Sequence, residues 1–152
     1  MSAAVLEGRL TGGQRIALHY FVVAVALFVA QTLFGVIAGL QFVYPDLLFG
    51  VLDFSVNRMV HINAMVVWLL YGFIGSVYWL IEDEAGTGLV GLVLAKLNFW
   101  VLTSAVVVVV LVYLLVQVGA GSSFSIWFIN EGREYIEAPR WADIGIVVCM
   151  LI

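Results

Sequence analysis

Three long stretches without a charged side chain constrain this sequence more than any other feature. About 20 helical residues, at roughly 1.5 Å of rise each, cross a hydrocarbon core that is about 30 Å thick. The three stretches contain 30, 23 and 34 residues, and they lie between Arg15 and Asp46, Arg58 and Glu82, and Lys96 and Glu131. Each is therefore long enough to span a bilayer, and we predict transmembrane helices near residues 16–41, 58–81 and 89–118.

The composition supports a membrane protein and excludes a soluble domain. Of the 152 residues, 64% are apolar and 11% are charged, whereas a soluble domain has about 45–50% and about 25%. The excess apolar surface must face lipid. Six Lys and Arg against ten Asp and Glu, without a basic cluster, exclude nucleic acid as a partner. The predicted fold is an all-α polytopic transmembrane helix bundle, with residues 1–152 as a single membrane domain.

The predicted links between the spans contain most of the polar residues. They are residues 44–57, an acidic link that contains Glu82, Asp83 and Glu84, and residues 119–143. A fourth apolar run, 144–152, begins at Ile144 and stops after nine residues at Ile152. Nine residues cannot cross a bilayer. We therefore expect the sequence to be the N-terminal part of a longer membrane protein.

His61 is the most informative residue, because it places an ionisable imidazole about one turn inside the second span. Such residues are costly in lipid and are usually functional. Arg58 lies three residues earlier, on the same helical face and closer to water. A haem requires this layout, with a neutral imidazole on the iron and a guanidinium beside the propionates. The alternative is that His61 only bonds a neighbouring helix while Arg58 extends to lipid phosphates.

The polar and small residues of the first span favour structural roles. His19 lies at the start of this span, where an interfacial histidine is the ordinary case. In a hairpin of the first two spans it would lie about 22 residues, or roughly 30 Å, from the level of His61. The two imidazoles then cannot ligate one iron, and a second axial ligand must come from outside this sequence. Gln31, Gly35 and Gly39 recur every four residues and indicate a helix-packing face.

The segment GREYIEAP, residues 132–139, brings charged side chains to the link after the third span, on the same side as His61. The carboxylates of Glu134 and Glu137 suit a hard cation such as Ca²⁺. Arg133 suits the anionic edge of a cofactor. An ordinary solvated loop is the alternative.

Three segments together resemble a known family. They are FGVIAGLQFVYPD at the end of the first span, RMVHINAMVVWLLYGFIG in the second, and GREYIEAP after the third. In order and spacing they resemble the start of the catalytic subunit of bacterial nitric oxide reductases, in the haem-copper oxidase superfamily. The resemblance covers essentially the whole chain. It implies a cytochrome oxidase subunit I-like fold of twelve helices, to which residues 1–152 would contribute three helices and the start of a fourth.

The resemblance also implies roles for individual residues. His61 corresponds to one axial ligand of a low-spin haem b, and Arg58 to an arginine near its propionates. Glu134 corresponds to a ligand of a structural calcium ion, and Arg133 lies beside that site as a further cofactor contact. The ligands of the high-spin haem b and of the non-haem iron would lie outside this sequence.

The implied activity is the reduction of nitric oxide to nitrous oxide, with electrons from a membrane-anchored cytochrome c subunit. The implied location is the bacterial cytoplasmic (inner) membrane, with a cytoplasmic N-terminus and His61 near the periplasmic face. By itself the 152-residue product would be inactive. Two alternatives remain: an oxygen-reducing cytochrome oxidase subunit I, which the resemblance of GREYIEAP argues against, and a non-catalytic multi-spanning membrane protein.

Overall fold

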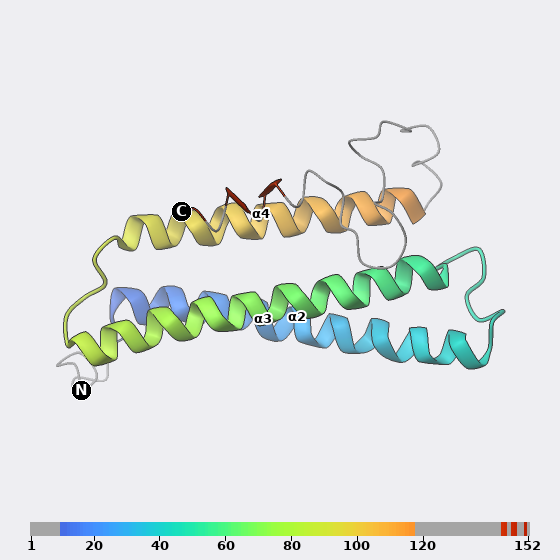
Figure 1. Cartoon of the computed structure of the whole chain (residues 1–152), viewed down its shortest axis with the longest axis horizontal. Coiled ribbons are helices and arrows are strands. Elements are labelled where there is room, and N and C mark those ends of the chain that lie inside the picture. Colours follow the sequence, from blue (N-terminus) through green and yellow to red (C-terminus); the bar gives the residue numbers. More distant parts are fainter. Residues whose placement is uncertain (1–9, 118–143, 146, 149–150, 152) are drawn as a thin grey trace.

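The fold consists of long antiparallel helices. The computed structural model describes residues 10–117 and, near the C-terminus, residues 144, 145, 147, 148 and 151. Its helices are α2 (Gly12–Val43), α3 (Phe54–Ala85) and α4 (Leu92–Gln117), and the described residues contain no strand. Each helix is long and apolar enough to cross a membrane. Figure 1 shows the three helices side by side, so the predicted all-α membrane bundle is confirmed for this part of the chain.

Backbone caps, rather than charges, set the ends of the helices. Thr11 caps α2 by a capping box, in which its hydroxyl accepts from the Gln14 N–H at 3.2 Å and the Gln14 amide oxygen accepts from the Thr11 N–H at 3.1 Å. Gly86 ends α3 in the left-handed conformation, with φ of 63°. As a result α2 begins, and α3 ends, four residues beyond the spans predicted from charge. Helix α4 begins three residues later than predicted.

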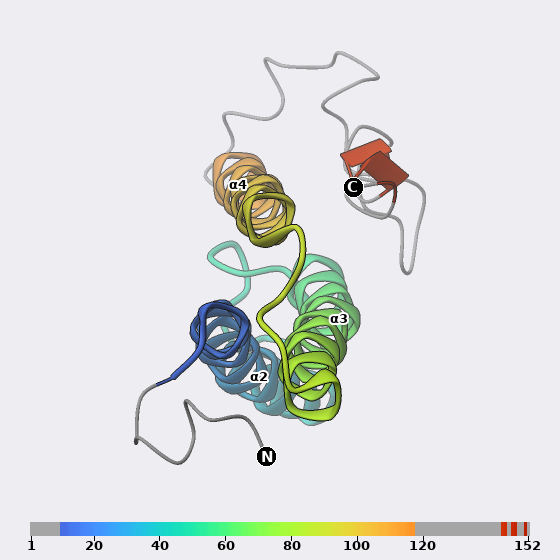
Figure 2. The same ribbon diagram turned by 90° about the vertical axis from the view of Figure 1, so that its left-hand side faces the viewer.

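A buried aromatic cluster joins α4 to the hairpin of α2 and α3. Tyr20 and Tyr71 are fully buried, and the ring of Phe99 lies 5.1 Å from that of Tyr20 between centroids. The Tyr20 hydroxyl donates to Asn98 Oδ1 at 2.8 Å, and the Tyr71 hydroxyl lies 2.9 Å from the hydroxyl of Thr103. Such polar contacts help membrane helices to associate, because the hydrophobic effect does not drive apolar side chains together in lipid. The end-on view in Figure 2 shows α4 lying over the α2–α3 pair.

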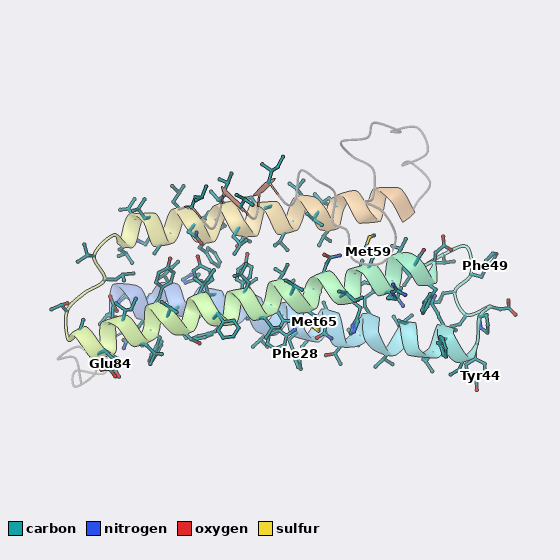
Figure 3. The ribbon with its side chains drawn as sticks, in the orientation of Figure 1. Phe28, Tyr44, Phe49, Met59, Met65 and Glu84 are labelled. Atoms are coloured by element: carbon teal, nitrogen blue, oxygen red, sulfur yellow. The ribbon has the colours of Figure 1, made fainter. Side chains whose placement is uncertain are left out.

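The outward faces of the helices are apolar. Phe42, Val22 and Phe73 are 81%, 68% and 68% exposed, and Figure 3 shows side chains of this kind projecting along the whole bundle. Such continuous apolar exposure suits lipid or further helices rather than water. Near the C-terminus the described residues of the predicted fourth span are helical, and Gly145 lies beside Ala105 of α4.

Glu82 corrects one prediction from the sequence. Together with Asp83 and Glu84 it belongs to the end of α3 rather than to the following link, and it is 1% exposed. Because α2 and α3 are antiparallel, its carboxylate lies at the N-terminus of α2. There it accepts hydrogen bonds from the backbone N–H groups of Gly13 at 3.0 Å and Gln14 at 3.1 Å, and from the Thr11 hydroxyl. It also accepts from the Leu89 N–H in the link to α4, at 2.6 Å.

This carboxylate accepts hydrogen bonds at the N-terminus of α2, where backbone N–H groups have no partner within the helix, and it connects α2 and α3 to the link before α4. Gly13 makes the contact possible, because a Cβ at this position would lie 2.5 Å from the carboxyl carbon of Glu82. Charge patterning along the chain does not reveal this role, since Asp83 and Glu84, the next two residues, are exposed.

We predict that Glu82→Gln lowers the thermal midpoint of the complete protein in detergent. The substitution places an NH₂ donor against backbone N–H donors, and each buried group left without a partner costs about 1–3 kcal/mol. Asp83→Asn is the matched control, because it makes the same change at the exposed neighbouring residue. Equal midpoints for the two variants would contradict the role of Glu82.

Candidate functional site

The imidazole of His61 faces the backbone of α2. It lies about two turns into α3 and is half-buried. Its Nδ1 lies 2.7 Å from the backbone carbonyl oxygen of Gln31 and 3.3 Å from Nε2 of the same residue. A carbonyl oxygen only accepts hydrogen bonds, so the 2.7 Å contact requires a hydrogen on Nδ1. The longer contact with the amide would require the opposite tautomer, and the shorter contact decides between them.

The chemical consequence concerns the other ring nitrogen. In a neutral imidazole whose Nδ1 carries the hydrogen, Nε2 carries the lone pair. Metal-ligating histidines have this arrangement, in which the second nitrogen donates to a carbonyl or carboxylate and thereby fixes the tautomer and the orientation of the ring. In its neutral form His61 therefore has its lone pair on Nε2, the arrangement that haem iron requires of a histidine ligand.

Gly35 provides the space for this ring. A Cβ at residue 35 would lie 2.5 Å from Cε1 and 2.7 Å from Nδ1 of His61. Gly39, one turn further along α2, has open space at the same point. Of the stripe that the sequence predicts as a packing face, Gln31 and Gly35 thus contact the imidazole. The four-residue spacing of Gln31 and Gly35 indicates in the sequence that they share a helical face. Only the register of α2 against α3 shows that this face meets His61.

His19 lies elsewhere on α2. Its Nδ1 is 2.7 Å from the Arg15 carbonyl oxygen within its own helix, and its exposed ring packs edge-on against Phe99. The residues that contact His61 lie 12 and 16 positions after His19, or about 18–24 Å along the helix axis. The separation is smaller than the predicted 30 Å, because His61 lies two turns inside α3 rather than one turn from the link. It still prevents the two imidazoles from sharing one iron.

A buried amide pair holds the end of the hairpin close to His61. Gln41 is 5% exposed and Asn57 is fully buried. The Gln41 side chain donates to the carbonyl oxygens of Leu47 at 3.2 Å and Leu52 at 2.7 Å in the link between α2 and α3, and it accepts from Asn57 Nδ2 at 2.8 Å. This network fixes the first turn of α3. Arg58 follows Asn57 directly and is half-buried.

The predicted site residues are therefore brought together only in part. Arg58 and His61 lie on successive turns of α3, as expected. Arg133 and Glu134 lie outside the described residues. Within the part of the chain that the structure describes, no three His, Cys, Asp or Glu side chains gather to hold a metal ion. The candidate site on these residues is thus one imidazole with a neighbouring guanidinium.

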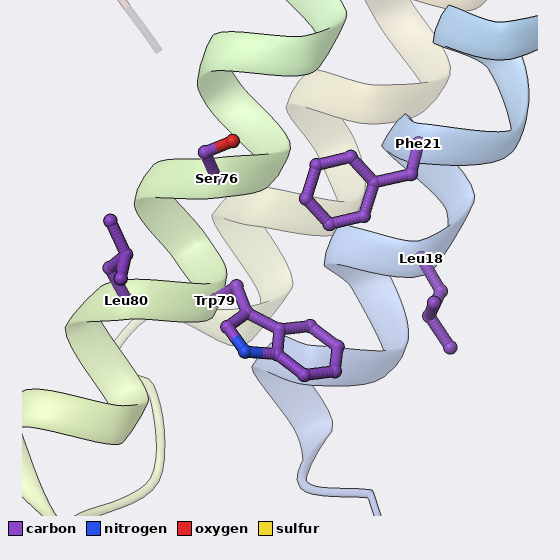
Figure 4. A pocket seen from close by; sticks show the side chains of 5 residues that line it. All are labelled: Leu18, Phe21, Ser76, Trp79 and Leu80. Atoms are coloured by element: carbon purple, nitrogen blue, oxygen red, sulfur yellow. The ribbon is translucent and has the colours of Figure 1, made fainter.

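A pocket between α2 and α3 lies on a different part of the hairpin. It encloses about 420 Å³ and is lined by Leu18, Phe21, Ser76, Trp79 and Leu80 (Figure 4). The Ser76 hydroxyl already donates to the Gly72 carbonyl oxygen at 2.8 Å. Ser76 also lies 15 residues after His61, which is about 22 Å along α3. This open and largely apolar groove is therefore separate from the candidate site.

Comparison with known proteins identifies the family. The profile described as cytochrome c and quinol oxidase polypeptide I matches residues 15–152. The chain belongs to this family. It is also 46% identical over 140 residues to a nitric oxide reductase subunit from Stutzerimonas stutzeri. The alignment covers 91% of the chain and 30% of that protein, so the chain spans less than a third of this relative.

Family membership confirms the resemblance seen in the sequence. It also agrees with the presence, in the described residues, of three helices long enough to cross a bilayer. The chain therefore belongs to a multi-pass membrane protein. Haem-type cofactors are the general property of this family. An imidazole with a fixed neutral tautomer is compatible with such a cofactor.

Proposed function

We propose that this chain provides one side of the low-spin haem b site of a nitric oxide reductase, with Nε2 of His61 as an axial ligand of the iron. One observation carries the proposal: the Nδ1 hydrogen of His61 is donated to the Gln31 carbonyl oxygen at 2.7 Å, which leaves the lone pair on Nε2. The similarity to the Stutzerimonas stutzeri nitric oxide reductase supports the choice of cofactor and enzyme. Haem, when bound there, supplies one-electron transfer.

The residues around His61 have supporting roles in this proposal. The backbone carbonyl of Gln31 fixes the tautomer, and Gly35 leaves room for the ring. Arg58, one turn nearer the start of α3, pairs with the haem propionates by charge-assisted hydrogen bonds. The buried pair of Gln41 and Asn57 holds this turn in place. The second axial ligand comes from outside these 152 residues.

For the complete protein, the proposal includes the whole reaction. Nitric oxide is reduced to nitrous oxide at a high-spin haem b and a non-haem iron whose ligands are not among these 152 residues. Electrons come from a membrane-anchored cytochrome c subunit and enter through the haem at His61. Residues 1–152 form one membrane domain in the bacterial inner membrane, with a cytoplasmic N-terminus, and would be inactive alone.

An oxygen-reducing cytochrome oxidase is the second candidate. It is favoured by the description of the matching family, which refers to cytochrome c and quinol oxidases. The 46% identity to a nitric oxide reductase favours nitric oxide as the substrate. A non-catalytic membrane protein has no such support.

We predict that His61→Ala removes the low-spin haem b signal from the reduced-minus-oxidised spectrum of the complete protein. The variant lacks the nitrogen that ligates the iron. His19→Ala is the matched control, because it removes the only other histidine of this chain, and it should leave the spectrum unchanged. Nitric oxide consumption should fall by at least 100-fold in the first variant only.

Two results would contradict the proposal. A normal haem spectrum in the His61→Ala protein would exclude this residue as a ligand. If the unaltered protein consumes oxygen but forms no nitrous oxide from nitric oxide, it is an oxygen-reducing oxidase and not a nitric oxide reductase.

We also propose that Glu134 ligates a calcium ion and that Arg133 contacts the adjoining cofactor, in the link after α4. The proposal is supported by the resemblance of GREYIEAP and by the preference of Ca²⁺ for carboxylate oxygens. We expect Glu134→Ala to lose one calcium per complex in metal analysis and to weaken the attachment of the cytochrome c subunit. Glu131→Ala, a change of the same charge three residues earlier, is the control. Equal calcium contents would exclude Glu134.

A further inference from the structure

The contact between His61 and α2 depends on an accessible backbone carbonyl, that of Gln31, which a side chain one turn later would normally cover. Each Cα–Cβ bond in a helix tilts toward the N-terminus. A side chain at residue 35 would therefore cover the carbonyl of residue 31, which lies one turn earlier. Because residue 35 is glycine, this carbonyl is open, and Nδ1 of His61 approaches it to 2.7 Å.

We propose that Gly35 and the Gln31 carbonyl are positioning elements that set the orientation and the donor strength of the His61 imidazole, and thereby the reduction potential of the haem that it ligates. The proposal rests on the proposed function of His61. A carbonyl that accepts the Nδ1 hydrogen makes the ring more basic at Nε2. A more basic ligand stabilises ferric iron more than ferrous iron and lowers the reduction potential.

The side chain of Gln31 is not the partner that matters. Its amide nitrogen lies 3.3 Å from Nδ1, compared with 2.7 Å for the carbonyl oxygen. A donor at this distance cannot bond a nitrogen that already carries a hydrogen. The positioning function therefore belongs to the backbone of Gln31 and to the missing side chain of Gly35. For this reason Gln31→Leu should leave the potential unchanged.

Gly35→Ala tests the proposal in the complete protein. The three atoms closest to the new Cβ all belong to the His61 ring, so the ring must move away from the carbonyl. We expect a higher midpoint potential of the low-spin haem and altered g-values of its ferric form, or loss of this haem where the ring moves too far. Gly39→Ala, which adds the same methyl group in open space, should leave both unchanged. A Gly35→Ala protein with the potential and g-values of the unaltered protein would overturn the proposal.

A second variant weakens the hydrogen bond without adding an atom. An ester in place of the peptide bond between Gln31 and Thr32, introduced with the α-hydroxy analogue of Thr32, makes the carbonyl a poorer acceptor. We expect the potential to rise in this protein, but not in one that carries an ester after Gly39. An unchanged potential, or an equal rise in Gln31→Leu, would overturn the assignment to the carbonyl.

The proposed function can fail separately from this inference. If His61→Ala retains its low-spin haem, the proposed function fails and the inference fails with it. If His61→Ala loses the haem while Gly35→Ala and the ester keep the original potential, the haem assignment stands and only the positioning role is excluded.

Discussion

The close approach of α2 to α3 positions both Glu82 and His61. At three levels a glycine on one helix receives a side chain of the other. Gly13 meets Glu82, Gly75 meets Tyr20, and Gly35 meets His61, each within 3.0 Å of the position of a Cβ. The residue numbers in the three pairs total 95, 95 and 96, as a single antiparallel register requires. Small residues allow this approach in membranes, where apolar burial alone does not hold helices together.

The same close approach lets side chains of α3 form hydrogen bonds with backbone groups of α2. At the start of α2, the N–H groups of the first helical turn donate hydrogen bonds to the Glu82 carboxylate. Two thirds of the way along, an uncovered carbonyl meets the His61 imidazole, which donates one. The first contact closes the helix end and the second selects a tautomer. Packing between the two helices therefore favours Nε2 as the nitrogen for iron, because the hydrogen bond at Nδ1 determines which nitrogen carries the lone pair.

The sequence predicts the helices well. Uncharged runs place all three helices, because membrane length and the cost of buried charge dominate at this scale. The sequence draws attention to His61 and Arg58 because ionisable groups in a span are rare, and the structure places them on successive turns of α3. The helix ends are not predictable from charge, since Thr11 and Gly86 set them through local capping geometry. The roles of Glu82, Gln31 and Gly35 could not be predicted, because they depend on how α2 and α3 are aligned. The spacing of residues along a single helix does not determine that alignment.

A high-resolution cryo-electron microscopy map of the complete protein with its haem would show whether the hairpin of α2 and α3 orients His61 for iron. We expect a low-spin haem whose iron is bonded to Nε2 of His61, with Nδ1 against the Gln31 carbonyl oxygen. A map in which the iron is bonded to another residue, or in which the His61 ring is turned away from α2, would contradict it.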